Sequence, residues 1–211
     1  MPERRAEPAV AGHVVLVGLM GSGKSTVGRK VARLLGVGFV DADVELEART
    51  GRSVAEWFTE GEAAFRGVEA DVLRDLLAGP EPLVIGSGGG VVVTAANRAQ
   101  LEAPGVSTVY LHAPPAFLAS RAKVKPHRPL LSGDPEAVLA GMYEDRDRWY
   151  RQVADAVVEV RPAHEAGERP KWRLAEAVVE ALVATGAGEP AAVARAGDVS
   201  GVVAGSAERR R

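Results

Sequence analysis

The sequence predicts an α/β fold built on a mostly parallel β-sheet. Short apolar runs rich in β-branched residues alternate along the chain with segments whose apolar residues recur at helical spacing. A glycine-rich loop, GLMGSGKST, stands between the first such run and the first helical segment. Alternating strands and helices form βαβ units, which build parallel sheets whose ligands gather at the carboxyl ends of the strands.

The N-terminal half contains two predicted strands and three predicted helices. Residues 13–17 (HVVLV) form an apolar, β-branched run that ends at a glycine, which is typical of a buried parallel strand. Residues 27–35 place valines and leucines on one helix face, and residues 39–40 form a second short strand that ends at an aspartate. Residues 53–56 (SVAE) are a capping box that opens a short helix, and residues 62–78 form a longer one.

The alternation continues in the middle of the chain. The third and fourth strands are the apolar runs at 83–85 (LVI) and 108–111 (TVYL). Helices are expected after them, at 94–101 and 115–122. The segment 123–133 is polar, basic and punctuated by prolines, so it predicts a loop.

Three further elements complete the predicted fold. Asp134 and Pro135 supply an N-cap and a proline at the first helical position, which opens a helix to about residue 153. Residues 156–160 (AVVEV) form the fifth strand, and residues 172–185 form the last helix.

Composition limits the class of protein. The 211 residues include 26 Lys and Arg against 28 Asp and Glu, a net charge of −2, which argues against a general nucleic-acid or membrane coat. The absence of cysteine excludes disulfides, thiolate metal sites and cysteine nucleophiles. We expect one domain at 12–185 between a flexible N-terminus at 1–11 and a disordered tail at 186–211, for which a weak partner-binding arm is the alternative.

We expect no targeting or membrane segment. The N-terminus lacks the apolar core of about 7–15 residues that a signal peptide needs, and no apolar run approaches the roughly 18 residues of a membrane span. The sequence therefore predicts a cytoplasmic protein that binds neither nucleic acid nor membrane. Because it has no heptad and no long apolar edge, we expect a monomer.

The glycine-rich loop matches G-x-x-x-x-G-K-[ST] in full over residues 18–25. Its glycines let successive backbone N–H groups converge on phosphate oxygens, and the following helix directs its positive end at the same anion. Lys24 can reach the β- and γ-phosphates, and Ser25 offers a hydroxyl to Mg²⁺. The loop predicts binding of a purine nucleoside triphosphate with Mg²⁺ and leaves the reaction open.

Two carboxylates, Asp41 and Asp43, follow the second strand. In one interpretation both face a cavity at the strand ends, where one orients Mg²⁺ through water and the other accepts a proton from a hydroxyl. In the other interpretation they are only a turn or a helix N-cap pair. The neighbouring phosphate loop favours the first.

Three consecutive glycines, Gly88, Gly89 and Gly90, follow the third strand. Because glycines cost backbone entropy, this run indicates close approach of a ligand or a positive φ, with a plain loop as the alternative. The strand ends in Gly86 and Ser87, where many phosphate-loop proteins have an aspartate, so metal support has to come from elsewhere.

Several charged side chains have both an ordinary and a functional interpretation. Arg66 and Glu69 are three residues apart on a helix and can pair, by default on the surface. Arg146 lies in a charged helical stretch that is by default a solvated face. Arg128 lies in the basic loop, which beside a phosphate loop indicates a lid that closes on phosphates. No histidine has a partner at metal-ligand spacing, so we assign none a metal or base role.

These motifs, in this order, resemble those of the shikimate kinase family. The combination is GLMGSGKST, DAD, GRS, FRxxE, GGG, RPLL and RxxxY, and it covers roughly residues 14–185. The resemblance implies a three-layer P-loop kinase fold with a central five-stranded parallel sheet, helices on both faces and a mobile lid at about 121–133. It also implies Mg²⁺-dependent transfer of the γ-phosphoryl group of ATP to the 3-hydroxyl of shikimate, giving shikimate 3-phosphate and ADP.

For the nucleotide, the resemblance implies contacts with the phosphate loop and with two arginines. The residues concerned are Gly21, Ser22, Gly23, Lys24, Ser25, Thr26, Arg121 and Arg128. Arg121 would lie against the adenine and Arg128 against the transferring phosphoryl group. Ser25 would hold Mg²⁺ directly and Asp41 would hold it through water. The second adenine contact is left open between Arg161 and Arg169, because the segment 161–172 is longer than the family pattern.

For the acceptor, the resemblance implies a site that holds a carboxylate and ring hydroxyls. The residues concerned are Asp43, Arg66, Gly88, Gly89, Gly90 and Arg146. Arg66 and Arg146 would grip the substrate carboxylate, since planar guanidinium groups suit it. Asp43 would hold the ring hydroxyls and is the candidate base, so that Lys24, Asp43 and Arg128 form the catalytic set.

Two rival functions stand beside this one. A gluconate kinase or a nucleoside-monophosphate kinase shares the loop and the fold but lacks the joint DxD, FRxxE and GGG pattern. A regulatory module without catalysis would bind ATP but show no substrate-dependent release of ADP.

Overall fold

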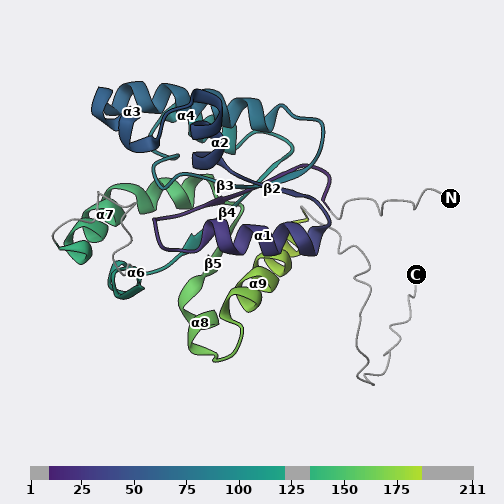
Figure 1. Ribbon diagram of the computed structural model, residues 1–211. Helices are drawn as coiled ribbons and strands as arrows, with labels where there is room; N and C mark the ends of the chain where they lie inside the picture. The colour runs from purple at the N-terminus through teal and green to yellow at the C-terminus, as the bar shows by residue number, and fades with distance from the viewer. Residues whose placement is uncertain (1–9, 122–133, 187–211) are drawn as a thin grey trace, which may run out of the picture.

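A five-stranded sheet in which every neighbouring pair of strands is parallel forms the centre of the molecule. The order across the sheet is β2-β3-β1-β4-β5 (Figure 1). The strands are β1 (His13–Val17), β2 (Gly38–Asp41), β3 (Leu83–Gly86), β4 (Val106–His112) and β5 (Ala156–Glu159). The predicted α/β fold with a parallel sheet is confirmed, and each strand lies within about two residues of its expected bounds.

This computed structural model describes residues 10–121 and 134–186. Residues 1–9 of the expected flexible N-terminus (1–11), most of the expected lid (122–133, with Arg128) and residues 187–211 of the expected tail (186–211) lie outside the described residues. Within the described part, no helix has both the length and the apolar character needed to cross a membrane.

Helices cover both faces of the sheet, so that it is the middle of three layers (Figure 1). In chain order they are α1 (Lys24–Leu35), α2 (Ala42–Thr50), α3 (Val54–Glu60), α4 (Glu62–Leu77), α5 (Ala95–Leu101), α6 (Pro115–Arg121), α7 (Pro135–Val153), α8 (Val160–Glu165) and α9 (Pro170–Ala184). Helices α1 and α9 pack side by side under one face, and α2, α4 and α7 lie over the other. The three-layer arrangement is confirmed.

Two of these helices were not expected. Helix α2 follows β2 at once, and α8 begins at Val160, which the sequence analysis assigned to the fifth strand. Each buries a single side chain, Leu46 in α2 and Val160 in α8. Without a wide apolar stripe, a helix leaves no periodic signal in the sequence.

The register of the sheet brings the functional loops together. Gly86 of β3 lies opposite Leu16 of β1 on one side and opposite Asp41 of β2 on the other. The three strands therefore end level with one another. The phosphate loop, the pair Asp41 and Asp43, and the segment 88–90 consequently start from one edge of the sheet, at the carboxyl ends of the strands.

Candidate active site

A single large cavity lies at this edge of the sheet. Its volume is about 1270 Å³, which is ample for two small ligands side by side. The wall consists of the phosphate loop, parts of α2, α3 and α4, the segment 88–90, and residues from the last four helices in the chain, α6 to α9. Most residues singled out in the sequence line it: Gly21, Ser22, Gly23, Lys24, Ser25, Thr26, Asp41, Asp43, Arg66, Gly88, Gly89, Gly90, Arg121 and Arg146.

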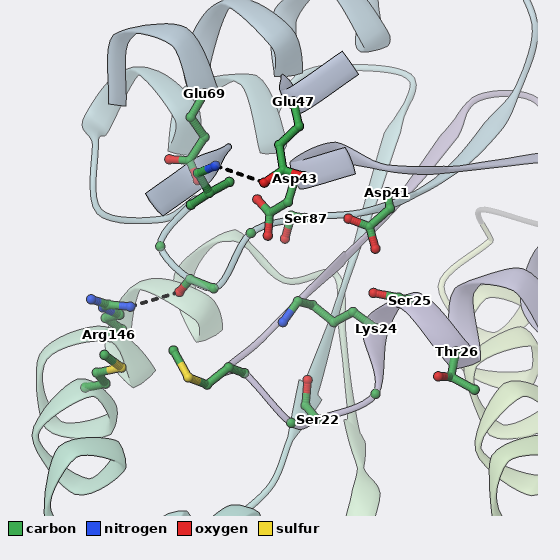
Figure 2. Close-up of a pocket in the computed structure, with 18 of the residues that line it drawn as sticks. Ser22, Lys24, Ser25, Thr26, Asp41, Asp43, Glu47, Glu69, Ser87 and Arg146 are labelled. Carbon is green, nitrogen blue, oxygen red and sulfur yellow. Dashed lines mark hydrogen bonds between the residues drawn. The ribbon is translucent and has the colours of Figure 1, made fainter. Parts of the chain in front are cut away.

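The phosphate loop joins β1 to α1 and turns through left-handed backbone at Gly21 (φ 88°) and Gly23 (φ 104°). Lys24 is the first residue of α1, and its Nζ donates to the carbonyl oxygens of Gly18 (2.6 Å) and Leu19 (3.1 Å). Figure 2 shows Lys24 between the loop and the carboxylates of Asp41 and Asp43. The loop therefore has the shape of an anion site at a helix N-terminus, with a buried ammonium group beside it.

Asp41 and Asp43 take different positions at the end of β2. Asp41 is the N-cap residue of α2, although its side chain makes no capping hydrogen bond, and Asp43 lies in the first turn. Both interpretations of the pair thus hold in part, because the helix starts here and both side chains also line the cavity. Burial, followed by the charge of Asp41, raises the pKa of Asp43 above its ordinary value. Lys24 lowers that pKa, to a smaller extent.

Arg66 and Glu69 form an ion pair inside the molecule. Their Nη1–Oε2 distance is 2.8 Å, and the residues are only 8% and 5% exposed. Burial works against the charge of Arg66, but Glu69 and Glu62 raise its pKa, so the guanidinium stays charged. The default expectation of a surface pair was therefore wrong, because α4 turns this face toward the cavity.

Glu69 is a site residue that the sequence analysis treated only as a partner of Arg66. Its second oxygen, Oε1, is buried, and no hydrogen-bond partner lies within reach among the described residues. Burial raises the pKa of Glu69, while Arg66 lowers it. The three-residue spacing from Arg66 places Glu69 on the same face, but only the tertiary structure shows that this face is a cavity wall.

Two of the three consecutive glycines, Gly88 and Gly90, make room for charged side chains of the protein itself. A Cβ at Gly88 would lie 2.8 Å from Asp43 Oδ1 and 2.9 Å from Glu69 Oε1, and a Cβ at Gly90 would overlap the Arg66 guanidinium. Gly88, Gly89 and Gly90 all have φ outside the left-handed region. The expectation of a positive φ is therefore wrong here. At Gly88 and Gly90 the close approach is by the protein's own side chains, and the approach of a ligand stays a prediction.

Helix α7 brings Arg146 to the same segment. Arg146 Nη1 donates to the carbonyl oxygen of Gly89 at 3.2 Å, as the dashed line in Figure 2 shows. The hydroxyl of Tyr150, one turn later, donates to the same oxygen. Arg146 is thus held at the cavity, opposite the phosphate loop, and does not belong to a purely solvated helix face.

The far end of the cavity is bordered by Arg121, the last residue of α6, together with His164, Lys171 and Leu174. Arg121 and Lys171 come near enough to His164 that they, after burial, lower its pKa. Arg161 instead pairs with Glu165 at 2.6 Å. His164 was not selected from the sequence, because it has no partner at metal-ligand spacing and α8, which carries it, was not predicted.

The oxygen donors near the phosphate loop are few. Among the described residues no group of three or more His, Cys, Asp or Glu side chains is arranged to hold a metal ion. The Asp41 carboxylate and the Ser25 hydroxyl lie near each other beside Lys24 (Figure 2). Such a donor set suits an ion that takes most of its ligands from phosphates and water, as Mg²⁺ does.

Comparison with known proteins gives one consistent family. A family model described as shikimate kinase matches residues 20–185. The shikimate kinase of Halorhodospira halophila is 48% identical over 172 residues, which cover 81% of this chain and 93% of that protein. The structure of Acinetobacter baumannii shikimate kinase in complex with shikimate has a TM-score of 0.75 at 35% identity and covers 83% of this chain and 95% of the other.

A rival named above has a weaker similarity. A gluconokinase from Sinorhizobium meliloti superposes with a TM-score of 0.53 at 23% identity, over 82% of this chain and 97% of that one. A similarity at this level of identity shows a shared fold and carries no inference about function.

Proposed function

The chain belongs to the shikimate kinase family, and we propose that it transfers the γ-phosphoryl group of ATP to the 3-hydroxyl of shikimate. The products are shikimate 3-phosphate and ADP. One observation carries the proposal: a single cavity has the phosphate loop on one side and a carboxylate next to two arginines on the other. Those two sides suit a nucleoside triphosphate and a small hydroxylated acid.

The nucleotide occupies the phosphate-loop side in this proposal. Backbone N–H groups of the loop, with Ser22, Gly23 and Thr26, surround the β-phosphate, and Lys24 exchanges its two carbonyl acceptors for phosphate oxygens. Arg121 lies at the far end of the cavity, where its guanidinium is available to the adenine. Arg128, outside the described residues, is the proposed contact of the transferring phosphoryl group.

Ser25 and Asp41 are the proposed holders of Mg²⁺, the first directly and the second through water. Hydroxyl and carboxylate oxygens are ligands that this hard cation prefers, and both side chains line the cavity near Lys24. When bound, the ion supplies neutralisation of charge on the β- and γ-phosphates.

The acid occupies the opposite side. Arg66 and Arg146 lie on separate helices that border the segment 88–90, and their guanidinium groups suit a carboxylate. Asp43 and Glu69 present carboxylate oxygens beside Gly88, where they are placed to accept hydrogen bonds from ring hydroxyls. Glu69 also fixes the direction of Arg66 through their ion pair.

In the reaction, the 3-hydroxyl oxygen forms a bond to the γ-phosphorus as the bond to the ADP oxygen breaks. Asp43 accepts the hydroxyl proton, and its raised pKa makes it a better acceptor than an exposed aspartate. Positioning and charge neutralisation provide most of the catalysis, since the transition state of phosphoryl transfer is loose.

Asp43→Asn tests the catalytic assignment. We expect turnover to fall by about 10²–10⁴-fold, because the proton acceptor is lost, while the Kd for ATP changes less than about twofold. ADP release measures the first quantity and calorimetric titration with ATP the second. Asp71→Asn, at an exposed carboxylate on α4, is the control and should leave both unchanged. Normal turnover in Asp43→Asn would contradict the role of Asp43.

The rival functions are separated by one assay. Coupled ADP release is measured with shikimate, gluconate and nucleoside monophosphates as acceptors in turn. ADP release that depends on shikimate supports the proposal. ADP release that depends on gluconate or a nucleoside monophosphate would contradict it and support that kinase activity instead. ATP binding without release in any of the three would instead support a regulatory module.

We further propose that the enzyme acts as a monomer in the cytoplasm, where ATP is available. Within the described residues the large exposed apolar side chains are Val44, Val157 and Val183, which belong to three different elements. Scattered residues of this kind do not form a contiguous apolar interface. Light scattering at micromolar concentration checks the oligomeric state.

A further inference from the structure

We propose that Tyr150 is a positioning residue for the acid side of the cavity, because its hydroxyl shares the Gly89 carbonyl oxygen with the Arg146 guanidinium. The proposal rests on the function proposed above, in which Arg146 binds the substrate carboxylate. Tyr150 itself does not line the cavity and would touch neither substrate.

The two donors come from one helix. Arg146 and Tyr150 are four residues apart on α7, so their side chains lie on the same face and reach the same carbonyl group. A carbonyl oxygen has two lone pairs, and these two donors occupy both. The position of the Arg146 guanidinium therefore depends on where Tyr150 holds the Gly89 oxygen, and on the Tyr150 hydroxyl itself, which lies within hydrogen-bond reach of that guanidinium.

The Tyr150 hydroxyl is a fixed donor. The residue is fully buried, and its ring stacks on Tyr110 with 4.9 Å between centroids and 25° between planes. The Tyr110 ring supplies this stack, while its hydroxyl donates elsewhere, to Asp147 Oδ1 at 2.9 Å. Burial raises the pKa of the Tyr150 phenol well above its ordinary value, although the charge of Arg146 and a hydrogen bond with it act in the opposite direction, so the hydroxyl stays protonated.

A second contact holds the same loop a few residues further on. Arg98 Nη1 donates to the carbonyl oxygens of Val92 (2.7 Å) and Val93 (3.1 Å). The Arg98 guanidinium also lies 4.9 Å from the centre of the Trp149 ring, which precedes Tyr150 on α7. Because the loop keeps this attachment, removing one hydroxyl should shift the Gly89 carbonyl without releasing the loop.

Tyr150→Phe is the variant that tests the proposal. Without the hydroxyl, the Gly89 oxygen has Arg146 as its remaining donor and draws that guanidinium away from the substrate carboxylate. We expect KM for shikimate to rise about 5- to 10-fold, the range that follows from loss of one buried hydrogen bond. KM for ATP should stay within about twofold of the wild type, since the nucleotide side is unaffected.

Tyr110→Phe is the matched control. It also removes one partly buried phenol hydroxyl from the same aromatic stack, but its partner is Asp147 and not the loop. We expect both variants to lose similar thermal stability, and only Tyr150→Phe to change KM for shikimate. Equal KM changes in the two variants, or none in Tyr150→Phe, would overturn the proposal.

A double-mutant cycle identifies the route of the effect. If Tyr150 acts through Arg146, then Tyr150→Phe has no further effect on KM for shikimate in the Arg146→Ala background. Additive effects would overturn the proposal while leaving the enzyme a shikimate kinase. A wild-type enzyme that releases no ADP with shikimate would overturn the proposed function and this inference with it.

Discussion

At Gly90, the volume of a single methyl group decides whether the acid side of the cavity can form. The Arg66 guanidinium occupies the space that a Cβ at this position would need. Arg66 cannot yield easily, because it is bonded to Glu69 at 2.8 Å and to Glu62 at 3.0 Å. The absence of a side chain at Gly90 therefore leaves room for the Arg66 guanidinium.

Gly90→Ala should displace Arg66 and raise KM for shikimate about tenfold or more, since overpacking a rigid contact costs about 1–3 kcal/mol. Steady-state kinetics with shikimate varied at saturating ATP measures the change. Gly67→Ala, at an open position on the same helix as Arg66, is the control. It should keep a normal KM and gain about 0.5–1 kcal/mol of stability. A normal KM in Gly90→Ala would show that Arg66 tolerates displacement.

At the residue scale, the sequence was sufficient to select the site residues but not to predict which of their side chains are buried. The residue types and spacings of Lys24, Asp43, Arg66 and Arg146 were sufficient to select them, and all four line the cavity. Exposure was not predictable, because spacing of three on a helix is compatible with either a wet or a buried face. The Arg66–Glu69 pair shows this, since it lies inside the molecule.

At the scale of the element, local chemistry explains where helices begin. Helix α3 starts at the predicted capping box, in which the Ser53 hydroxyl accepts from Glu56 N at 3.2 Å and Glu56 Oε2 accepts from Ser53 N at 2.7 Å. Helix α7 starts at Asp134, whose Oδ1 accepts from Glu136 N at 3.0 Å. Helices α2 and α8 have no comparable side-chain cap and went unpredicted.

Ser53→Ala should destabilise α3, which forms part of the cavity wall through Phe58. Loss of an N-cap typically costs about 1 kcal/mol, which for a chain of this size lowers Tm by about 2–4 °C. Hydrogen exchange of the α3 amides should become faster at the same time. Thr59→Ala, which removes a hydroxyl from the same helix but no cap, should stay within about 0.5 kcal/mol of the wild type. Equal losses in both variants would contradict the capping role.

At the scale of the whole molecule, the near-neutral net charge of −2 conceals a concentration of charged groups of both signs in the cavity. The cavity gathers Lys24, Arg66 and Arg146 together with the carboxylates of Asp43 and Glu69. Burial raises the pKa of both of these carboxylates. A site that suits two anionic substrates thus contains groups whose charged forms destabilise the ligand-free protein.

The burial of its carboxylate predicts a conflict between activity and stability at Asp43. Because its pKa is raised in the folded protein, the folded state loses stability as pH rises through that pKa. Asp43→Asn should therefore be more stable than the wild type at neutral pH, by about 1 kcal/mol or about 2–4 °C in Tm, although we expect its turnover to be much lower. The difference should shrink toward acid pH in thermal unfolding without ligands. If the Tm values of the two proteins differ by the same amount at every pH, the raised pKa of Asp43 does not cause the difference in stability.

The sequence alone determined the fold class, the phosphate loop and the kind of chemistry, because these depend on local patterns. A parallel sheet follows from alternating strands and helices, and an anion site follows from glycines and a lysine at fixed spacing. Strand ends could be predicted to within about two residues for the same reason.

Only the tertiary structure decided which side chains meet and which are buried. The level ends of β1, β2 and β3 bring together loops that are tens of residues apart, and α7 crosses the sheet edge to place Arg146 and Tyr150 on the Gly89 carbonyl. These contacts depend on strand register and helix packing over long separations. No local pattern encodes them, because each residue's immediate neighbours in the chain are compatible with several partners in space.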